Sequence, residues 1–236
     1  MTKAVWTTGR AVAGTVAFGL LAAGCQAPGP SWGTGVVKES DAFGYYESIV
    51  NVPVPTGTPR SFQCNGPFAP NTSDVTMKGI FGQSNVVTST DVLQPDGSVG
   101  PGSVLLPNDP KLRVAVAWAD GFGYTGPTRA NFSEETAWSV SGIGIGASLA
   151  DLEKANGKPF RLVGFGGTGG GVITDWQGGA LSGLAGGCNL NVQLAISALA
   201  PASAQAKVVG PKVFLSSDRN VRALKPTVGK FWVLYN

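Results

Sequence analysis

The stretch Gly164-Phe-Gly-Gly-Thr-Gly169 has the most obvious chemical meaning in this sequence, because it satisfies the G-x-G-x-x-G pattern of dinucleotide-binding loops. Such a site also needs a helix directly after the glycines, to face the pyrophosphate, and an acidic residue about 20 residues further on. Here the chain continues as Gly170-Gly-Val-Ile-Thr-Asp-Trp176, which is typical of a strand. We therefore expect a glycine-rich hairpin loop and no cofactor.

The residue types in this sequence give little support for a hydrolase. The 236-residue sequence contains no histidine, which excludes Ser-His-Asp and Cys-His arrangements and argues against a metal site. Two pairs of acids are candidates for glycoside hydrolysis, Glu134 with Glu135 and Asp120 with Asp175, but no spacing distinguishes them from ordinary loop acids. We expect a protein that is not an enzyme, with a carboxylate-based hydrolase as the less favoured alternative.

The first 24 residues are typical of a signal peptide. They carry Lys3 and Arg10, no acid, and then a small and apolar run over residues 11–24. This run is shorter than the about 20 apolar residues that a membrane-spanning helix needs. We expect it to be removed on export.

Residues Leu21-Ala-Ala-Gly-Cys25 resemble the lipobox of bacterial lipoproteins, in which the cysteine thiol receives diacylglycerol. The family usually has leucine three places before the cysteine, where this chain has Ala22. The resemblance implies a lipid on Cys25 and, because Gln26 follows it, a location on the periplasmic face of the outer membrane. The alternative is an ordinary secretory signal cleaved near residues 22–24.

The two other cysteines, Cys64 and Cys188, are expected to pair, because an envelope compartment is oxidising. The bridge would close a loop of about 125 residues, for which chain entropy predicts a stabilisation of roughly 4 to 5 kcal/mol. Two buried free thiols are the alternative.

The composition favours a β-rich domain and argues against nucleic acid as a partner. Only 13% of the residues are charged, against about 25% in an average chain, and 35 are glycine. Without Lys3 and Arg10, the 17 basic residues become 15, against 14 acidic ones. A nearly neutral chain with no basic run lacks the charge on which nucleic-acid binding rests.

Two short helices are predicted, over 73–82 and 148–157. Each begins with a serine that can cap the helix and ends at a glycine nine places later. Ser148 and Asp151 have the spacing of a capping box. The predicted apolar stripes join Val75 to Gly79 and Ile80 in the first helix, and Leu149 to Leu152 in the second.

Strand-like segments follow each helix, and those over 112–118 and 188–196 alternate clearly between apolar and polar residues. The other predicted strands are 45–54, 85–93, 103–106, 160–165, 171–176, 212–215 and 231–235, with a loop over 121–127 and a loop or short helix near 201–206. The fold class that follows is α+β, with two repeated units of a short helix packed on an antiparallel sheet. The predicted organisation is a signal peptide (1–24), a lipidated cysteine with a flexible tether (25–44), a first unit (45–130) and a second unit (131–236).

The segment Gly144–Phe160 resembles the opening of small envelope lipoproteins of the BamE (SmpA/OmlA) type, with a short helix between a glycine-rich turn and Gly157-Lys-Pro. Two such units, offset by 75 residues, also resemble the β-lactamase inhibitor protein fold. The resemblance implies a topology and carries no activity with it.

Aromatic residues near glycine-rich loops are the candidate binding face: Phe122, Tyr124, Phe165 and Trp176. The alternative is that tryptophans such as Trp176 fill the core. These features together favour a membrane-anchored, non-catalytic binding or assembly module, whose partner is another envelope protein or peptidoglycan. A protein inhibitor of an envelope or secreted enzyme is the alternative.

Overall fold

A computed structural model of the chain describes residues 38–40, 45–47 and 60–236. The predicted signal peptide and Cys25 lie outside the described residues. The strands are β1 (Lys38–Ser40), β2 (Tyr45–Glu47), β3 (Arg60–Phe62), β4 (Val86–Leu93), β5 (Val99–Leu105), β6 (Val114–Asp120), β7 (Thr125–Phe132), β8 (Trp138–Val140), β9 (Ile143–Gly144), β10 (Arg161–Val163), β11 (Ile173–Asp175), β12 (Cys188–Ala195), β13 (Val213–Leu215) and β14 (Thr227–Tyr235). The helices are α1 (Asp74–Phe81), α2 (Leu149–Asn156), α3 (Ala202–Gln205) and α4 (Arg219–Ala223), with 3-10 turns η2 (Gly66–Phe68) and η3 (Gln83–Asn85).

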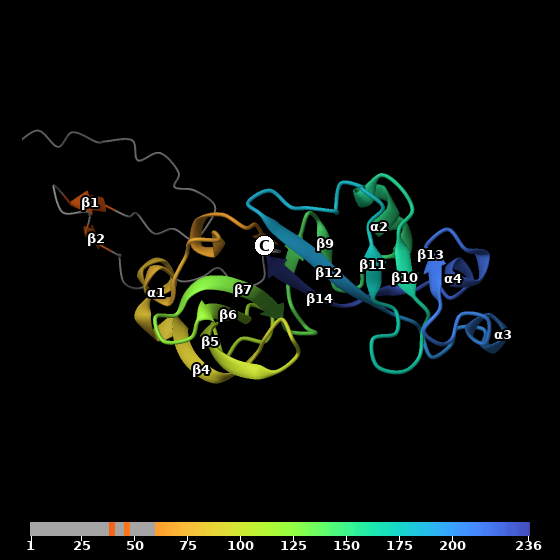
Figure 1. The fold of residues 1–236 in the computed structure, drawn as a ribbon, viewed down its shortest axis with the longest axis horizontal. Coiled ribbons are helices and arrows are strands. Elements are labelled where there is room, and N and C mark those ends of the chain that lie inside the picture. The colour runs from red at the N-terminus through yellow and green to blue at the C-terminus, as the bar shows by residue number, and fades with distance from the viewer. Residues whose placement is uncertain (1–37, 41–44, 48–59) are drawn as a thin grey trace, which may run out of the picture.

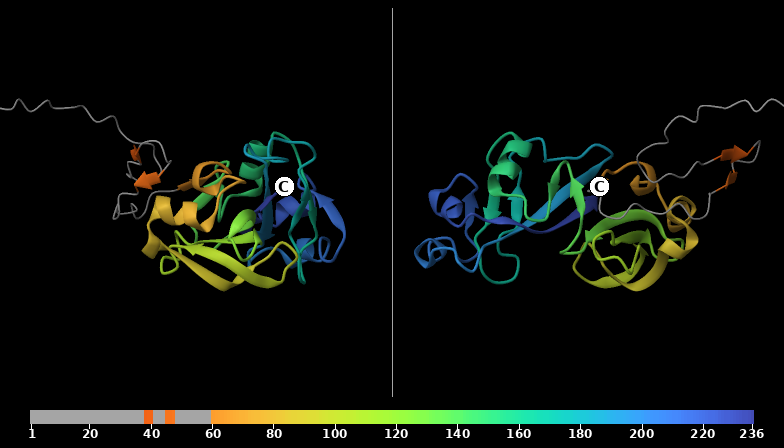
Figure 2. Two further views of the ribbon diagram at one scale, coloured as in Figure 1. Left: turned by 60° about the vertical axis from the view of Figure 1, so that its left-hand side comes forward. Right: turned by 180° about the vertical axis from the view of Figure 1, so that it is seen from behind.

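The main sheet has six antiparallel strands in the order β12-β14-β7-β6-β5-β4. It connects two lobes (Figure 1). The first lobe holds α1 and β4–β7, and the second holds α2–α4, β10, β11 and β13. Strands β12 and β14 run from one lobe into the other, which is also visible from behind (Figure 2). The fold is mixed, with far more strand than helix, as the composition predicted.

Smaller sheets complete the structure: β11-β10-β13, β3-β8-β9 and β1-β2. Strand β1 falls within residues 25–44, for which a flexible tether was predicted, and it pairs with β2, which lies inside the predicted strand 45–54. An isolated bridge between Val172 and Gln193 connects the β10–β11 hairpin to β12. No helix in the described part of the chain is long and apolar enough to cross a membrane.

Both predicted helices are confirmed, with their caps. The Ser73 hydroxyl accepts a hydrogen bond from the Thr76 amide in α1. In α2 the capping box between Ser148 and Asp151 is complete, because each side chain accepts from the other residue's backbone N–H. Gly157 ends α2 in the left-handed conformation, at a φ of 77°.

The apolar stripe predicted for α1 is wrong. Val75 is 75% exposed and Ile80 is also exposed, while Asp74 and Met77 are the buried residues. The Asp74 carboxylate accepts a 2.6 Å hydrogen bond from Ser103 of β5, and the Asp74 amide donates to the Tyr124 carbonyl. A polar network therefore sets the rotation of the helix about its axis. In α2 the predicted Leu149 and Leu152 are buried.

Aromatic rings fill the core where the lobes meet. Phe62 packs on Phe68 with ring centroids 4.6 Å apart, and Phe132 packs on Phe231 at the same separation. The predicted disulfide between Cys64 and Cys188 is present beside this cluster, with a Cα–Cα distance of 6.3 Å. It ties the segment after β3 to the beginning of β12.

The glycine-rich loop connects the antiparallel strands β10 and β11, so its interpretation as a hairpin loop is confirmed. Strand β11 follows the glycines directly, where a dinucleotide site would need a helix. Gly171 has a φ of 77° and lies so close to β12 that a Cβ atom there would clash with the Leu194 carbonyl oxygen. The glycines thus serve tight turns and a close backbone approach.

Candidate functional site

The predicted aromatic face does not form. Phe165 and Trp176 are only 3% and 9% exposed and belong to the hydrophobic core, where the Trp176 indole donates to the Leu190 carbonyl. Tyr124 is half-buried and packs against the same core. Phe122 alone projects fully, at 99% exposure. The interpretation of Trp176 as a core residue is the correct one, because its ring packs against Phe160 within the core.

Phe122 is held at the tip of a rigid hairpin between β6 and β7. The Asp120 carboxylate accepts hydrogen bonds from the amides of Phe122 and Gly123, and these bonds lower the pKa of Asp120. Tyr124 completes the turn with a positive φ of 51°. The backbone of the tip is thereby fixed, while the phenyl ring stands in solvent.

The candidate catalytic acids do not converge. Asp120 lies at the β6–β7 turn of the first lobe, whereas Asp175 ends β11 in the second (Figure 1). Glu134 forms an exposed ion pair with Lys230 at 3.5 Å. Among the described residues, no group of three or more histidine, cysteine, aspartate or glutamate side chains is placed to hold a metal ion.

The outer face of the main sheet, opposite the aromatic core, carries a different set of side chains. Alternation along β7 turns Ala130 and Phe132 into the core and leaves Arg129 and Asn131 on the outer face. On the neighbouring strand β14, Trp232 is the cross-strand partner of Asn131. The Arg129 guanidinium lies over the Trp232 ring, 4.9 Å from its centroid, in a cation–π contact.

Strand β6 leaves room for these side chains, because its outward residues are small. Ala117 is the partner of Arg129, and Ala115 is the partner of Asn131. Larger residues at these two positions would occupy the space that the arginine now uses. The pairing register of β6, β7 and β14 therefore brings Arg129, Asn131 and Trp232 together.

The end of β4 curls over this outer face. Its Val92 packs with Val104, Ala115 and Ala117 in a second, small core. The Asn131 side chain donates to the Leu93 carbonyl at 2.9 Å, which joins β4 to β7 across the curl. The curl leaves a cavity of about 210 Å³, the Arg129 cavity, between the end of β4 and strands β6, β7 and β14. It is lined by Asp91, Val92, Leu93, Arg113, Ala115, Arg129, Asn131, Phe132, Lys230, Phe231 and Trp232.

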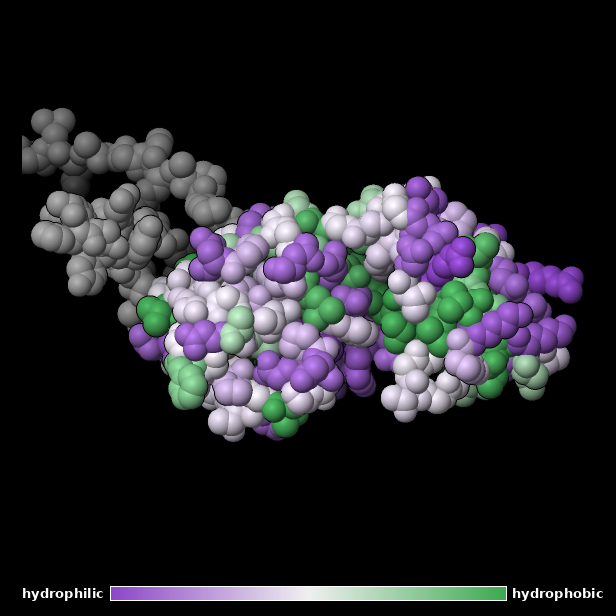
Figure 3. All heavy atoms as spheres, viewed as in Figure 1, coloured by the Kyte–Doolittle hydropathy of each residue, from purple (hydrophilic) through white to green (hydrophobic). Residues whose placement is uncertain are grey.

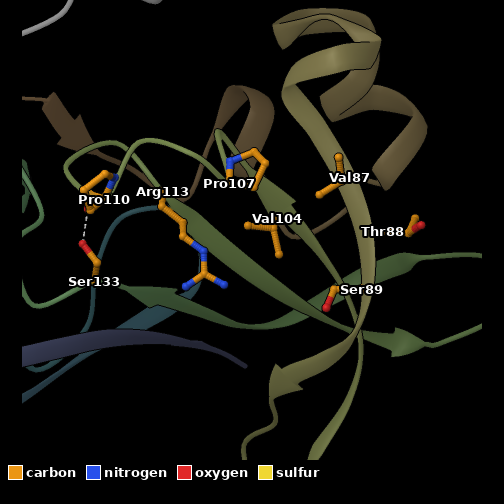
Figure 4. A pocket seen from close by; sticks show the side chains of 8 residues that line it. All are labelled: Val87, Thr88, Ser89, Val104, Pro107, Pro110, Arg113 and Ser133. Atoms are coloured by element: carbon orange, nitrogen blue, oxygen red, sulfur yellow. Dashed lines mark hydrogen bonds between the residues drawn. The ribbon is translucent and has the colours of Figure 1, made fainter.

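A larger and more open concavity of about 470 Å³ adjoins it through the shared residue Arg113. Figure 4 shows Arg113 extending into the space between β4 and the loop that carries Pro107 and Pro110. Val87, Thr88 and Ser89 of β4 lie on the opposite side. The two hollows share Arg113 and both lie along β4, and together we call them the β4 groove.

The Arg129 cavity is cationic. Its lining holds Arg113, Arg129 and Lys230 but only one acid, Asp91. Arg129 is 8% exposed, and burial lowers its pKa. Its Nε donates to the Asn131 Oδ1 at 2.6 Å, and no carboxylate among the described residues lies within ion-pair distance of it.

Sequence reasoning missed this site. Residues 121–127 were predicted as a loop, so the strand that presents Arg129 was not recognised. Trp232 was placed on a strand but given no role. Phe231 and Val233 face the core, and since side chains alternate along a strand, this pattern could have predicted that Trp232 lies on the outer face.

Apolar atoms are also exposed on the second lobe, around the three-stranded sheet (Figure 3). Val209 is exposed, as are Val213 and Leu215 of β13, the edge strand of that sheet. Lys212 lies over the Phe214 ring of the same strand, 5.5 Å from its centroid, but this lysine is exposed to water. The β4 groove, which holds a buried guanidinium, remains the better candidate site.

Comparison with known proteins gives no match: no family model, no curated protein and no solved structure matches the chain.

Proposed function

We propose that this chain is a non-catalytic binding module that docks an anionic partner in the β4 groove. The observation that carries the proposal is Arg129, a buried guanidinium with no carboxylate partner in the described structure. Taking a charge out of water is costly unless a counter-charge accompanies it. An anionic group of a partner would supply that counter-charge.

The proposal places the module in the cell envelope, held on the periplasmic face of the outer membrane by lipid on Cys25. The partner is another envelope protein or peptidoglycan. The Cys64–Cys188 disulfide supports an oxidising compartment.

The proposed architecture comprises two repeated helix-plus-sheet units, within 45–130 and 131–236. Its support is a matching detail in both halves. The N-cap residue of α1, Ser73, bridges to Thr125 at the beginning of β7, and that of α2, Ser148, bridges to Thr227 at the beginning of β14. The two strands that receive these bridges, β7 and β14, pair with each other antiparallel in the main sheet.

Affinity capture at native expression level tests this function. The wild-type chain should enrich an envelope component over the Cys25→Ser variant, which lacks the anchor. Arg129→Met should lose that component, whereas Arg219→Met, which removes an exposed arginine from α4 in the second lobe, should retain it. If the wild-type and Cys25→Ser chains capture the same material, the anchored binding module is refuted. If Arg129→Met captures normally, the β4 groove is not the contact.

Inhibition of an enzyme is a second candidate function, favoured by Phe122. A fully exposed aromatic ring on a rigid tip is suited to insertion into an apolar pocket of another protein. In that case Phe122→Ala would abolish capture and Arg129→Met would not.

A further inference from the structure

We infer that the Arg129 cavity is a subsite for a carboxylate, and specifically for the C-terminal carboxylate of a peptide. The inference rests on the proposed function only in taking the β4 groove as the binding surface. It adds the chemical class of the group that is bound.

The orientation of Arg129 is fixed before any ligand arrives. The amide nitrogen of Asn131 is committed to the carbonyls of Leu93 and Ala115, at 2.9 and 3.4 Å. Its oxygen must therefore face Arg129, whose Nε donates to it. The Trp232 ring covers one face of the guanidinium. These two contacts leave the terminal Nη1 and Nη2 groups as the remaining donors.

A planar pair of N–H donors matches the two oxygens of a carboxylate, which guanidinium groups bind in a bidentate manner. In the described structure no side chain or carbonyl accepts a hydrogen bond from either Nη group of Arg129. The cavity of about 210 Å³ is many times the roughly 10 to 15 Å³ that a single water needs, so it has room for a carboxylate and a few further heavy atoms.

The lining favours a carboxylate over a phosphate. Asp91 lies in the same lining and would repel a dianion more strongly than a monoanion. Lys230 already pairs with Glu134 at the surface, and Arg113 is exposed, so water screens both charges and the buried Arg129 guanidinium carries most of the attraction. A single positive charge is matched by a single negative one.

The remaining lining favours a peptide end over a sugar acid. Val92, Ala115 and the Trp232 ring contribute carbon atoms to the lining beside the arginine. A short aliphatic segment next to the carboxylate can be buried against them, whereas sugar hydroxyl groups would lose their hydrogen bonds to water there.

Solution NMR of the full chain carrying Cys25→Ser tests the inference, with N-acetylglycine as the probe. The Arg129 Nε–H signal, assigned with Arg129→Lys, and the Trp232 indole signal, assigned with Trp232→Phe, should shift in a saturable manner. N-acetylglycinamide, which has the same shape without the charge, should produce no saturable shift. Inorganic phosphate and glucuronate should bind at least about tenfold more weakly than N-acetylglycine, which converts to about 1.4 kcal/mol.

Variants at Arg129 distinguish the effect of the bidentate geometry of the guanidinium from the effect of its positive charge. Arg129→Lys retains the positive charge but loses the bidentate geometry, so the Trp232 shift should require at least about tenfold more N-acetylglycine. Arg219→Lys is the matched control and should titrate as the wild type. If Arg129→Lys does not fold, Trp232→Leu, which removes the ring that orients the guanidinium, should weaken binding as read from the Arg129 Nε–H signal.

Equal shifts with the acid and the amide would overturn the inference, as would unchanged binding by a folded Arg129→Lys variant. Tighter binding of phosphate would overturn the choice of carboxylate, and tighter binding of glucuronate would overturn the choice of a peptide. The proposed function fails separately: capture that depends on Arg129, together with no response to N-acetylglycine, would leave the module intact and refute only the carboxylate subsite.

Discussion

Replacing Ser103 by alanine should remove the centre of the buried network that seats α1 on the sheet. Ser103 is fully buried, donates to the Asp74 carboxylate at 2.6 Å and accepts from the Trp118 indole at 2.9 Å. A hydrogen bond to a charged group contributes about 1.5 to 3 kcal/mol, and a buried donor left without a partner costs about 1 to 3 kcal/mol. Because Asp74 keeps its 2.7 Å ion pair with Lys78, we expect the lower part of the combined range, about 2.5 to 4 kcal/mol.

Urea unfolding measures this loss. At a slope of about 2 kcal/mol per molar, the midpoint should fall by about 1 to 2 M with the slope unchanged. Ser98→Ala is the matched control, since Ser98 also donates to an aspartate, Asp96, but on an exposed turn; its effect should stay within about 0.5 kcal/mol. In a double-mutant cycle with Trp118→Phe, Ser103→Ala should lower the free energy of unfolding by less, because no indole N–H is then left without an acceptor. A loss for Ser103→Ala no larger than that for Ser98→Ala would refute the reasoning.

Three further outcomes are expected. Replacing Cys64 and Cys188 together by serine should lower the free energy of unfolding by about 5 kcal/mol from loop closure alone, and a change below about 1 kcal/mol by calorimetry would contradict this. Burial raises the pKa of Tyr235, whose hydroxyl donates to the Phe68 carbonyl, so its contribution to stability is fully present below about pH 10 and is lost above it as the unfolded chain ionises. Tyr235→Phe should flatten that alkaline decline, and an unchanged profile in denaturation from pH 8 to 11 would exclude this cause. Phe122→Ala should leave the melting temperature unchanged, because its ring makes no packing contribution; a clear drop would show that the ring is not free.

The helices could be predicted because their signals are local. Ser148, Asp151 and Gly157 lie within ten residues and make their capping contacts with the helix itself. The buried side of α1 could not be predicted, because it is set by Ser103 from a different strand. The apolar spacing predicted that Val75 would be buried, whereas the structure buries Asp74 and leaves Val75 exposed.

Strand β7 was missed because its first half looks like a turn. Gly126 and Pro127 are turn residues by composition, and Pro127 lies where the register with β6 shifts, a position at which a sheet tolerates proline. Without β7 there was no reason to connect Arg129 with Trp232, which lies 103 positions later. Their contact depends on strand order, which no local pattern encodes.

The most direct test of a carboxylate subsite at Arg129 is the NMR titration of the Arg129 Nε–H signal with N-acetylglycine and its amide. We expect a saturable shift with the acid, shared by the Trp232 indole and absent with the amide. No saturable shift with the acid, in a folded chain whose Arg129 signal is observed, would refute the carboxylate subsite.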